Sequence, residues 1–144
     1  MKTAYIALGT NIGDLPENLK SAEQAIDSLR LTRITSRSSH YRTAPIGYTE
    51  QADFLNSVVK VQTGLLPLEL LDSLLNIETR IGRQRTIHWG PRIIDLDLLI
   101  YGDDVIRDPR LELPHPRMHE RAFVLAPLAE IAPSLQILGA PPAT

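Results

Sequence analysis

The sequence contains no cysteine, which excludes disulfide bonds and thiolate metal sites. It has no apolar run near the roughly 18 residues that a membrane span needs. The first nine residues hold one cation and too short an apolar stretch for a signal peptide. With 43% hydrophobic and 22% charged residues, the composition is that of a folded protein rather than a disordered one. We therefore expect a single domain over residues 1–144 that works in the cytoplasm, as a monomer and away from membranes.

A basic excess is also missing, because the formal net charge is −2. This argues against a nucleic-acid partner. Two nucleotide-binding motifs are absent as well: neither the P-loop G-x-x-x-x-G-K-[ST] nor the dinucleotide fingerprint G-x-G-x-x-G occurs. Twelve of the fifteen cations are nevertheless arginines, the side chain best suited to bidentate phosphate contacts. The pattern indicates phosphate chemistry without a standard nucleotide loop.

Hydrophobic periodicity predicts a β-α-β-β-α-β order. The first helix begins at Asp14, a good N-cap with Pro16 in the first turn, and its apolar positions are spaced by 4, 3, 4 and 3 residues. The second helix runs from about Pro67 to a stop at Gly82. Strands are predicted at 3–8, 34–41, 54–62 and 93–101. This order predicts a ferredoxin-like α+β fold, an antiparallel sheet with helices packed on it and additions at the C-terminal end.

Three finer expectations concern the second half of the chain. The apolar run 93–101 is predicted to be a buried central strand, and a short strand near 105–106 to pair back on it as a hairpin. Residues 122–131 are predicted to form a helix in two pieces, because Pro127 interrupts them.

Two carboxylates in the run 93–101 are the strongest sign of chemistry. Side chains alternate along a strand, so Asp95 and Asp97 point to the same face. Carboxylates on an otherwise apolar strand are costly to bury unpaired, and a hard cation such as Mg²⁺ offsets that cost. The competing interpretation is an amphipathic strand with one wet face; the apolar flanks favour the metal site.

A basic loop precedes this strand. Residues 80–92 carry four arginines and no acid, with Gly and Pro that allow movement. Such a loop beside two carboxylates fits a polyphosphate bound between them, although it can also be simply a solvated loop. In the segment 113–121, His115 and His119 have the spacing of a helical zinc pair, but Pro116 lies between them, and a phosphate contact fits better.

Aromatic residues are scarce, seven in all, so their positions are informative. Phe54, Trp89 and Phe123 could stack on a flat heteroaromatic ligand while the amide of Asn56 reads its edge. Phe54 and Phe123 also fit an ordinary core. A single tryptophan in a Gly/Pro loop fits a core less well.

Several ordered motifs together resemble a known family. These are A-Y-I-A-L-G-T-N-x-G from Ala4, Y-R-T-x-P at 41–45, D-F-L-N at 53–56, G-P-R-x-x-D-L-D-L at 90–98 and P-H-P-R-M from Pro114. The sequence is similar to the 6-hydroxymethyl-7,8-dihydropterin pyrophosphokinases of folate biosynthesis, from Ala4 to about Pro133.

This resemblance implies transfer of diphosphate from ATP to the pterin hydroxyl, release of AMP, and two Mg²⁺ ions. It implies Asp95 and Asp97 as metal ligands and Arg83, Arg85 and Arg92 as catalytic, phosphate-facing arginines. We add Asp97 to the catalytic residues as the candidate for assisting deprotonation of the hydroxyl. The implied ATP-binding residues are Glu78, Arg85, Arg92, Arg110, His115 and Arg121. The implied pterin-binding residues are Thr43, Pro45, Phe54, Asn56, Trp89, Asp95 and Phe123.

Two alternatives remain open. Asp95 and Asp97 would also suit a two-metal nucleotidyl transferase on a similar fold, which would release pyrophosphate instead of AMP. A non-catalytic RNA-binding or ligand-sensing module of the same fold is the other, but RNA-binding versions display aromatic side chains on the sheet where this chain has carboxylates.

Overall fold

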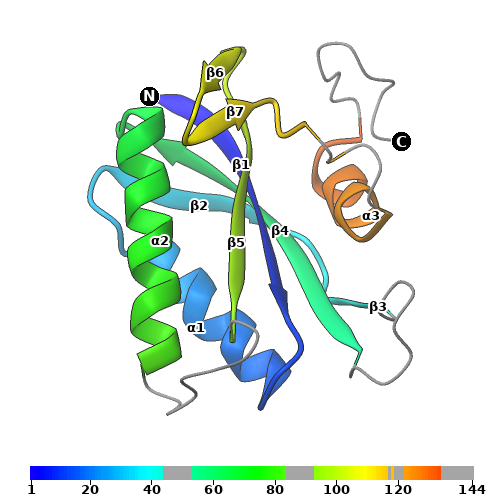
Figure 1. Cartoon of the computed structure of the whole chain (residues 1–144). Coiled ribbons are helices and arrows are strands. Elements are labelled where there is room, and N and C mark those ends of the chain that lie inside the picture. Colours follow the sequence, from blue (N-terminus) through cyan, green and yellow to red (C-terminus); the bar gives the residue numbers. More distant parts are fainter. Residues whose placement is uncertain (44–52, 84–92, 117, 119–121, 134–144) are drawn as a thin grey trace.

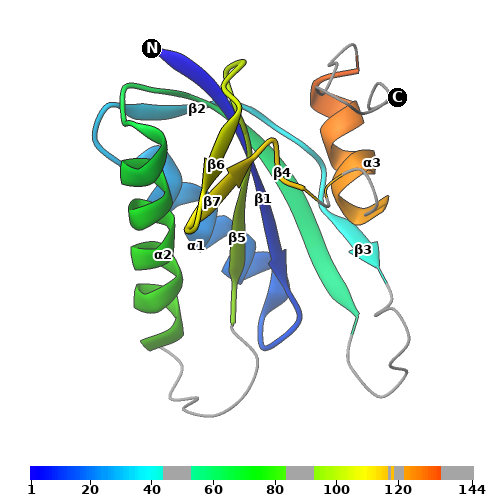
Figure 2. The same ribbon diagram turned by 45° about the horizontal axis from the view of Figure 1, so that its top comes forward.

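The computed structural model describes residues 1–43, 53–83, 93–116, 118 and 122–133. They form β1 (Lys2–Thr10), α1 (Leu15–Asp27), β2 (Thr32–Arg37), β3 (Tyr41–Thr43), β4 (Phe54–Thr63), α2 (Pro67–Arg83), β5 (Asp95–Tyr101), β6 (Ile106–Asp108), β7 (Leu111–Leu113) and α3 (Ala122–Ile131). The main sheet is antiparallel with the order β2-β4-β1-β5, and β3 also pairs with β4. Figures 1 and 2 show α1 and α2 together on one side and α3 apart from them. The prediction of an antiparallel sheet with packed helices is confirmed.

Local signals set the start of α1. The Asp14 carboxylate accepts the N–H of Glu17 at 3.2 Å, and Pro16 lies in the first turn, where its missing N–H costs no helical bond. The predicted apolar face packs on the sheet through Leu19, Ala22 and Ile26, which are fully buried. The N-cap and the buried face are therefore as predicted.

Helix α2 begins at Pro67 as predicted but does not stop at Gly82. It continues to Arg83, and Gly82 lies inside it. A glycine ends a helix through a left-handed conformation at the C-terminus, and Gly82 shows no positive φ. Leu70, Leu74 and Ile77 are fully buried, and each such side chain stabilises the fold by about 1.5–3 kcal/mol.

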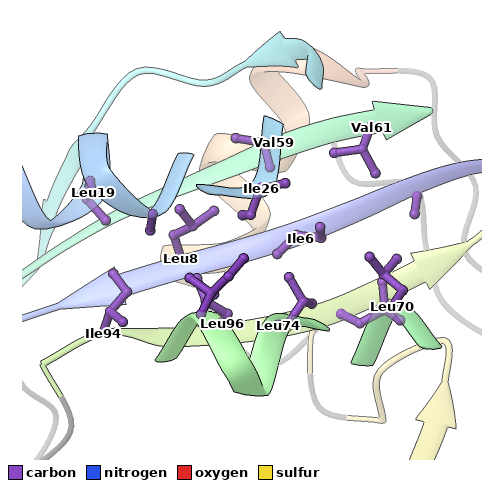
Figure 3. Close-up of a cluster of buried hydrophobic side chains, with 14 of the residues drawn as sticks. Ile6, Leu8, Leu19, Ile26, Val59, Val61, Leu70, Leu74, Ile94 and Leu96 are labelled. Carbon is purple, nitrogen blue, oxygen red and sulfur yellow. The ribbon is translucent and has the colours of Figure 1, made fainter. Parts of the chain in front are cut away.

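Side chains of both helices meet those of the sheet in one core. Figure 3 shows Leu19 and Ile26 of α1 and Leu74 of α2 directed at Ile6 and Leu8 of β1. This core fills the face of the sheet that carries α1 and α2.

The strand predictions need three corrections. The predicted strand 34–41 is two strands, β2 and β3, and residues 38–40 between them belong to neither. β5 is not central: it is the last strand in the order, and its outer edge is covered by α2 and by the segment after β7. The strand at 106–108 pairs forward with β7 and not back with β5.

Helix α3 runs without a break from Ala122 to Ile131, although the sequence predicted two pieces. Pro127 lies inside it and removes one N–H from the ladder without ending it. Val124 and Leu128 are buried against Tyr5 and Val58 on the second face of the sheet, so packing holds the helix together there. In the part of the chain that the structure describes, no helix is long and apolar enough to cross a membrane.

Candidate active site

One row of residues crosses three strands of the sheet. Gly9 of β1 stands opposite Asn56 of β4 on one side and opposite Asp95 of β5 on the other. Directly opposed residues in antiparallel strands point to the same face. Strands lie about 4.8 Å apart, so the Cα atoms of Asp95 and Asn56 are separated by roughly 10 Å across the glycine.

This row faces away from α1 and α2. The neighbouring residues Leu8, Leu55 and Leu96 belong to the core under those helices. Ala7 and Val58, two positions along from Gly9 and Asn56, pack instead with α3. The candidate site therefore lies on the second face of the sheet, beside the part that α3 covers.

The two carboxylates lie on this face as predicted. Asp97 stands opposite Ala7, one pleat along from the pair of Asp95 and Gly9. Asp95 is exposed and Asp97 is half-buried. Two residues along a strand separate their Cα atoms by about 7 Å, a spacing that suits two carboxylates ligating neighbouring cations.

The donor set suits Mg²⁺ held jointly with a phosphate. Among the residues that the structure describes, no group of three or more His, Cys, Asp or Glu is placed to hold a metal ion. Mg²⁺ is commonly bound by one or two carboxylates, with substrate phosphates and water completing the shell. Asp95 and Asp97 meet that requirement.

The amide of Asn56 is fixed from two sides. Its Nδ2 donates to the Thr43 hydroxyl at 2.8 Å, and the residue is 4% exposed. A Cβ built on Gly9 would come within 2.9 Å of Asn56 Oδ1, so only glycine lets the amide lie this close to β1. An amide has two donors and an acceptor, and can therefore hold Thr43 and still contact a heteroaromatic edge.

Phe54 lies next to this amide. It is the first residue of β4, stands opposite Thr43 and is half-buried. Because Phe54 and Asn56 are two residues apart, they share the face of the candidate site. The structure thus brings together three of the predicted pterin residues, Thr43, Phe54 and Asn56, with Asp95 in the same row as the amide.

A buried polar clasp holds the start of β5. The Thr10 hydroxyl donates to the Ile93 carbonyl at 2.5 Å and accepts from Asn18 Nδ2 at 3.1 Å. Asn18 Nδ2 also donates to the Ile12 carbonyl at 2.7 Å. Thr10 and Asn18 are each 1% exposed. The clasp fixes the chain two residues before Asp95, and sequence reasoning missed it.

Three predicted ATP-side residues lie along the outer side of β5 and α2. Glu78 accepts the Leu96 N–H at 2.7 Å. The main-chain N–H of His115 donates to the Leu99 carbonyl at 2.8 Å, next to an irregularity in the pairing of β5 with β1. Arg110 forms an ion pair with Asp72 of α2. All three have structural partners here, and their contacts with ATP stay predictions.

The remaining predicted residues are not brought together by the described structure. Arg83 ends α2 and Phe123 lies in the first turn of α3. The other predicted residues, together with His119 of the disfavoured zinc pair, lie outside the described residues: Pro45, Arg85, Trp89, Arg92 and Arg121.

Sequence comparison identifies the family. The profile described as 7,8-dihydro-6-hydroxymethylpterin-pyrophosphokinase (HPPK) matches residues 5–133. The chain is 47% identical over 135 residues to the 2-amino-4-hydroxy-6-hydroxymethyldihydropteridine pyrophosphokinase of Haemophilus influenzae, covering 94% of this chain and 84% of that one. It is also 47% identical to the Bacillus subtilis enzyme of that name, covering 92% and 80%, and 48% identical to that of Methylorubrum extorquens, covering 96% and 88%.

Solved structures agree on the fold. A Plasmodium falciparum HPPK-DHPS with pterin and p-hydroxybenzoate superposes with a TM-score of 0.75 at 18% identity, over 94% of this chain and 40% of that one. An HPPK-DHPS in complex with substrates gives 0.72 at 14% identity, over 96% and 41%. The chain thus spans about two fifths of those longer chains. With the profile and the relatives in agreement, the chain belongs to the 7,8-dihydro-6-hydroxymethylpterin-pyrophosphokinase family and is a transferase of the pyrophosphokinase type.

Proposed function

We propose that the protein transfers diphosphate from ATP to 6-hydroxymethyl-7,8-dihydropterin, giving the pterin diphosphate and AMP in folate biosynthesis. The observation that carries this is the row in which Asp95 and Asn56 flank Gly9 on one face. It sets carboxylates suited to a cation–phosphate complex about 10 Å from an amide suited to a flat heterocycle. The family and the names of the relatives supply the identity of that heterocycle.

In this reaction the pterin hydroxyl oxygen attacks the β-phosphorus of ATP. The bond from that phosphorus to the oxygen bridging to the α-phosphorus breaks, and AMP leaves with the bridging oxygen. The hydroxyl proton is lost, and Asp97, which would lie between the metal and the hydroxyl, is the candidate for assisting its removal. Little covalent chemistry is asked of the protein, so positioning and charge neutralisation supply most of the rate.

Asp95 and Asp97 would hold two Mg²⁺ ions. Ions bound there would neutralise phosphate oxygens and orient the transferring group. Arg83, Arg85 and Arg92 add the remaining positive charge, since their planar guanidinium groups match phosphate oxygens in pairs.

The two substrates lie on either side of this centre. Phe54, Trp89 and Phe123 stack on the pterin or close over it, Asn56 and Asp95 contact its polar atoms, and Thr43 holds the Asn56 amide. Pro45 completes that pocket. ATP is contacted by Glu78, Arg110, His115 and Arg121 together with Arg85 and Arg92.

Three broader assignments accompany this function. The elements β1, α1, β2, β4, α2 and β5 form a ferredoxin-like βαββαβ unit to which β3, β6, β7 and α3 are additions; the chain order and the strand order support this. Residues 1–144 act as one domain and as a monomer. The protein works in the cytoplasm on small molecules and without nucleic acid, in keeping with its net charge of −2.

The test is an assay of AMP release with ATP, Mg²⁺ and 6-hydroxymethyl-7,8-dihydropterin. AMP formation that requires both the pterin and the metal, and stops with EDTA, supports the proposal. Pyrophosphate instead of AMP would identify a nucleotidyl transferase. Absence of both products from folded protein would overturn the proposed reaction.

A further inference from the structure

The connection between β2 and β3 is anchored at each of its three residues. Ser38 donates its N–H to the Val58 carbonyl and accepts the Val58 N–H on its hydroxyl, both at 2.9 Å. A side-chain oxygen thus replaces a main-chain carbonyl where the edge strand bends. His40 Nε2 lies 3.3 Å from a carboxylate oxygen of Glu23 on α1. The third anchor, at Ser39, comes from α3.

Glu130 of α3 anchors Ser39 through several hydrogen bonds. The Ser39 N–H lies 3.0 Å from both carboxylate oxygens, and the Ser39 hydroxyl donates to one of them at 2.9 Å. The Tyr41 hydroxyl donates to the other at 2.7 Å. These bonds lower the pKa of the Glu130 carboxyl, the Tyr41 hydroxyl contributing most, and the same hydrogen bond raises the pKa of Tyr41.

The position of this acid is unfavourable for its own helix. Glu130 lies in the last turn of α3, where the helix dipole opposes a negative charge. The hydrogen bonds of Glu130 therefore hold Ser39 and Tyr41 in place and do not favour the end of α3 itself. That segment continues directly into β3.

β3 depends on such anchoring. It has three residues and pairs with β4 alone in the described structure. Tyr41 stands opposite Asn56, and Thr43 holds the Asn56 amide at 2.8 Å. The element that Glu130 fixes thus determines where the amide of the candidate site lies, while the other end of α3 carries Phe123.

We infer that Glu130 is a positioning residue for the pterin site: it ties the end of α3 to β3 through Tyr41 and Ser39, and so sets the Thr43–Asn56 pair relative to α3. This rests on the proposed function, which assigns Thr43, Asn56 and Phe123 to the pterin. Glu130 itself does not contact the substrate.

The inference predicts a selective defect. In Glu130→Ala, loss of the bonds to Ser39 and Tyr41 should raise the KM for the pterin about fivefold to tenfold. The KM for ATP and kcat at saturation should stay within about twofold, because the defect concerns the pocket and not the phosphate site. Tyr41→Phe removes one donor and keeps the ring, so it should give a smaller defect of the same kind.

Asp27→Ala is the matched control. Asp27 accepts the Ile34 N–H at 2.8 Å, so it too is an exposed acid that anchors the edge strand, but at the end away from β3. It should lower Tm without changing the pterin KM, whereas Glu130→Ala changes both. Tyr41→Phe keeps the test decisive if Glu130→Ala fails to fold.

The outcomes separate the two proposals. No AMP from the wild-type protein overturns the proposed function and this inference with it. Wild-type turnover together with an unchanged pterin KM in Glu130→Ala and Tyr41→Phe overturns the inference alone. An equal rise in the KM values of pterin and ATP, or a pterin defect also in Asp27→Ala, identifies a general structural effect and overturns it as well.

Discussion

Glu78 of α2 accepts the main-chain N–H of Leu96 at 2.7 Å, between the two carboxylates of β5. β5 is the last strand in the sheet order, so this N–H is directed at a helix and not at another strand. Removing the acceptor leaves a partly buried amide unsatisfied, at a cost of about 1–3 kcal/mol. Glu78→Ala should therefore reduce the free energy of unfolding, measured by urea denaturation, by about that amount.

Asp72→Ala is the control on the same helix. It removes an exposed ion pair with Arg110, and such pairs contribute about 0–1 kcal/mol. If Glu78→Ala costs no more than Asp72→Ala, the bond to Leu96 does not stabilise β5.

Asp95→Asn and Asp97→Asn should lower kcat/KM about a thousandfold or more and leave folding intact. Several kilocalories of charge stabilisation depend on the cations that these carboxylates would hold. Because Asp95 is exposed and Asp97 half-buried, an amide can replace either without opening the core. The rate is measured over a range of Mg²⁺ concentrations, with Tm as the folding check. Asp103→Asn, in the turn after β5, is the control and should keep the full rate; near-normal turnover by either site variant would contradict the metal assignment.

The features that were predicted correctly depend on residues close together in the chain. The N-cap at Asp14 and the Pro at the start of α2 are set by backbone groups within one turn. The common face of Asp95 and Asp97 follows from strand alternation alone. These features needed no knowledge of the tertiary fold.

Features that depend on distant partners were missed or wrong. The apolar sequence of β5 suggested a central strand, but burial comes from α2 and the segment near His115, which cover its outer edge. Pro127 suggested a break in a helix that packing on the sheet keeps whole. The position of Gly9 between Asn56 and Asp95 also could not be predicted from the sequence. It depends on the pairing register of three strands that are far apart in the chain.

Gly9→Ala should weaken pterin binding with a modest loss of stability. The new methyl would meet Asn56 Oδ1 at 2.9 Å, and the buried amide can retreat only by straining its bond to Thr43. Loss of about one hydrogen bond corresponds to a fivefold to tenfold rise in the pterin KM, roughly 1 kcal/mol. Steady-state kinetics with the pterin varied at saturating ATP measure this.

A second glycine-to-alanine change, away from the candidate site, distinguishes an effect on the pterin site from a general effect of replacing glycine. Gly82→Ala lies inside α2, where, apart from its chain neighbours and the backbone of its own helix, no atom of the described residues comes within 4 Å of the new Cβ. It should leave the pterin KM unchanged and slightly stabilise the helix. A Gly9→Ala protein with the wild-type pterin KM would mean that the close approach to Asn56 has no functional role.

Thr10→Val tests the clasp at the start of β5. Valine keeps the shape but removes the hydroxyl that bonds the Ile93 carbonyl and Asn18 Nδ2. We expect a loss of about 1–3 kcal/mol in the free energy of unfolding, because a buried carbonyl loses its partner. Thr10→Ser keeps the hydroxyl and should cost clearly less; equal losses in the two variants would assign the effect to packing.

Stability should fall at both ends of the pH range through the contacts of Glu130. The hydrogen bonds from Tyr41 and Ser39 lower the pKa of the Glu130 carboxyl below its ordinary 4.5, so the unfolded chain binds this proton more readily than the folded one. The contribution of Glu130 is therefore fully present above pH 4.5 and is lost as the pH falls through the lowered pKa.

The pKa of Tyr41, the hydrogen-bond partner of Glu130, is shifted upward instead of downward. The hydrogen bond to Glu130 raises the pKa of Tyr41 above 10.0, so its contribution is present below pH 10 and is lost as the pH rises through the raised pKa. Urea denaturation between pH 3 and 11 should thus give a smaller difference between wild type and Glu130→Gln at either extreme than near pH 7. Tyr41→Phe should reduce the alkaline loss and leave part of the acid loss, because Ser39 still bonds the carboxylate. A difference between wild type and Glu130→Gln that stays constant across the range would mean that the carboxylate charge does not stabilise the contact between α3 and β3.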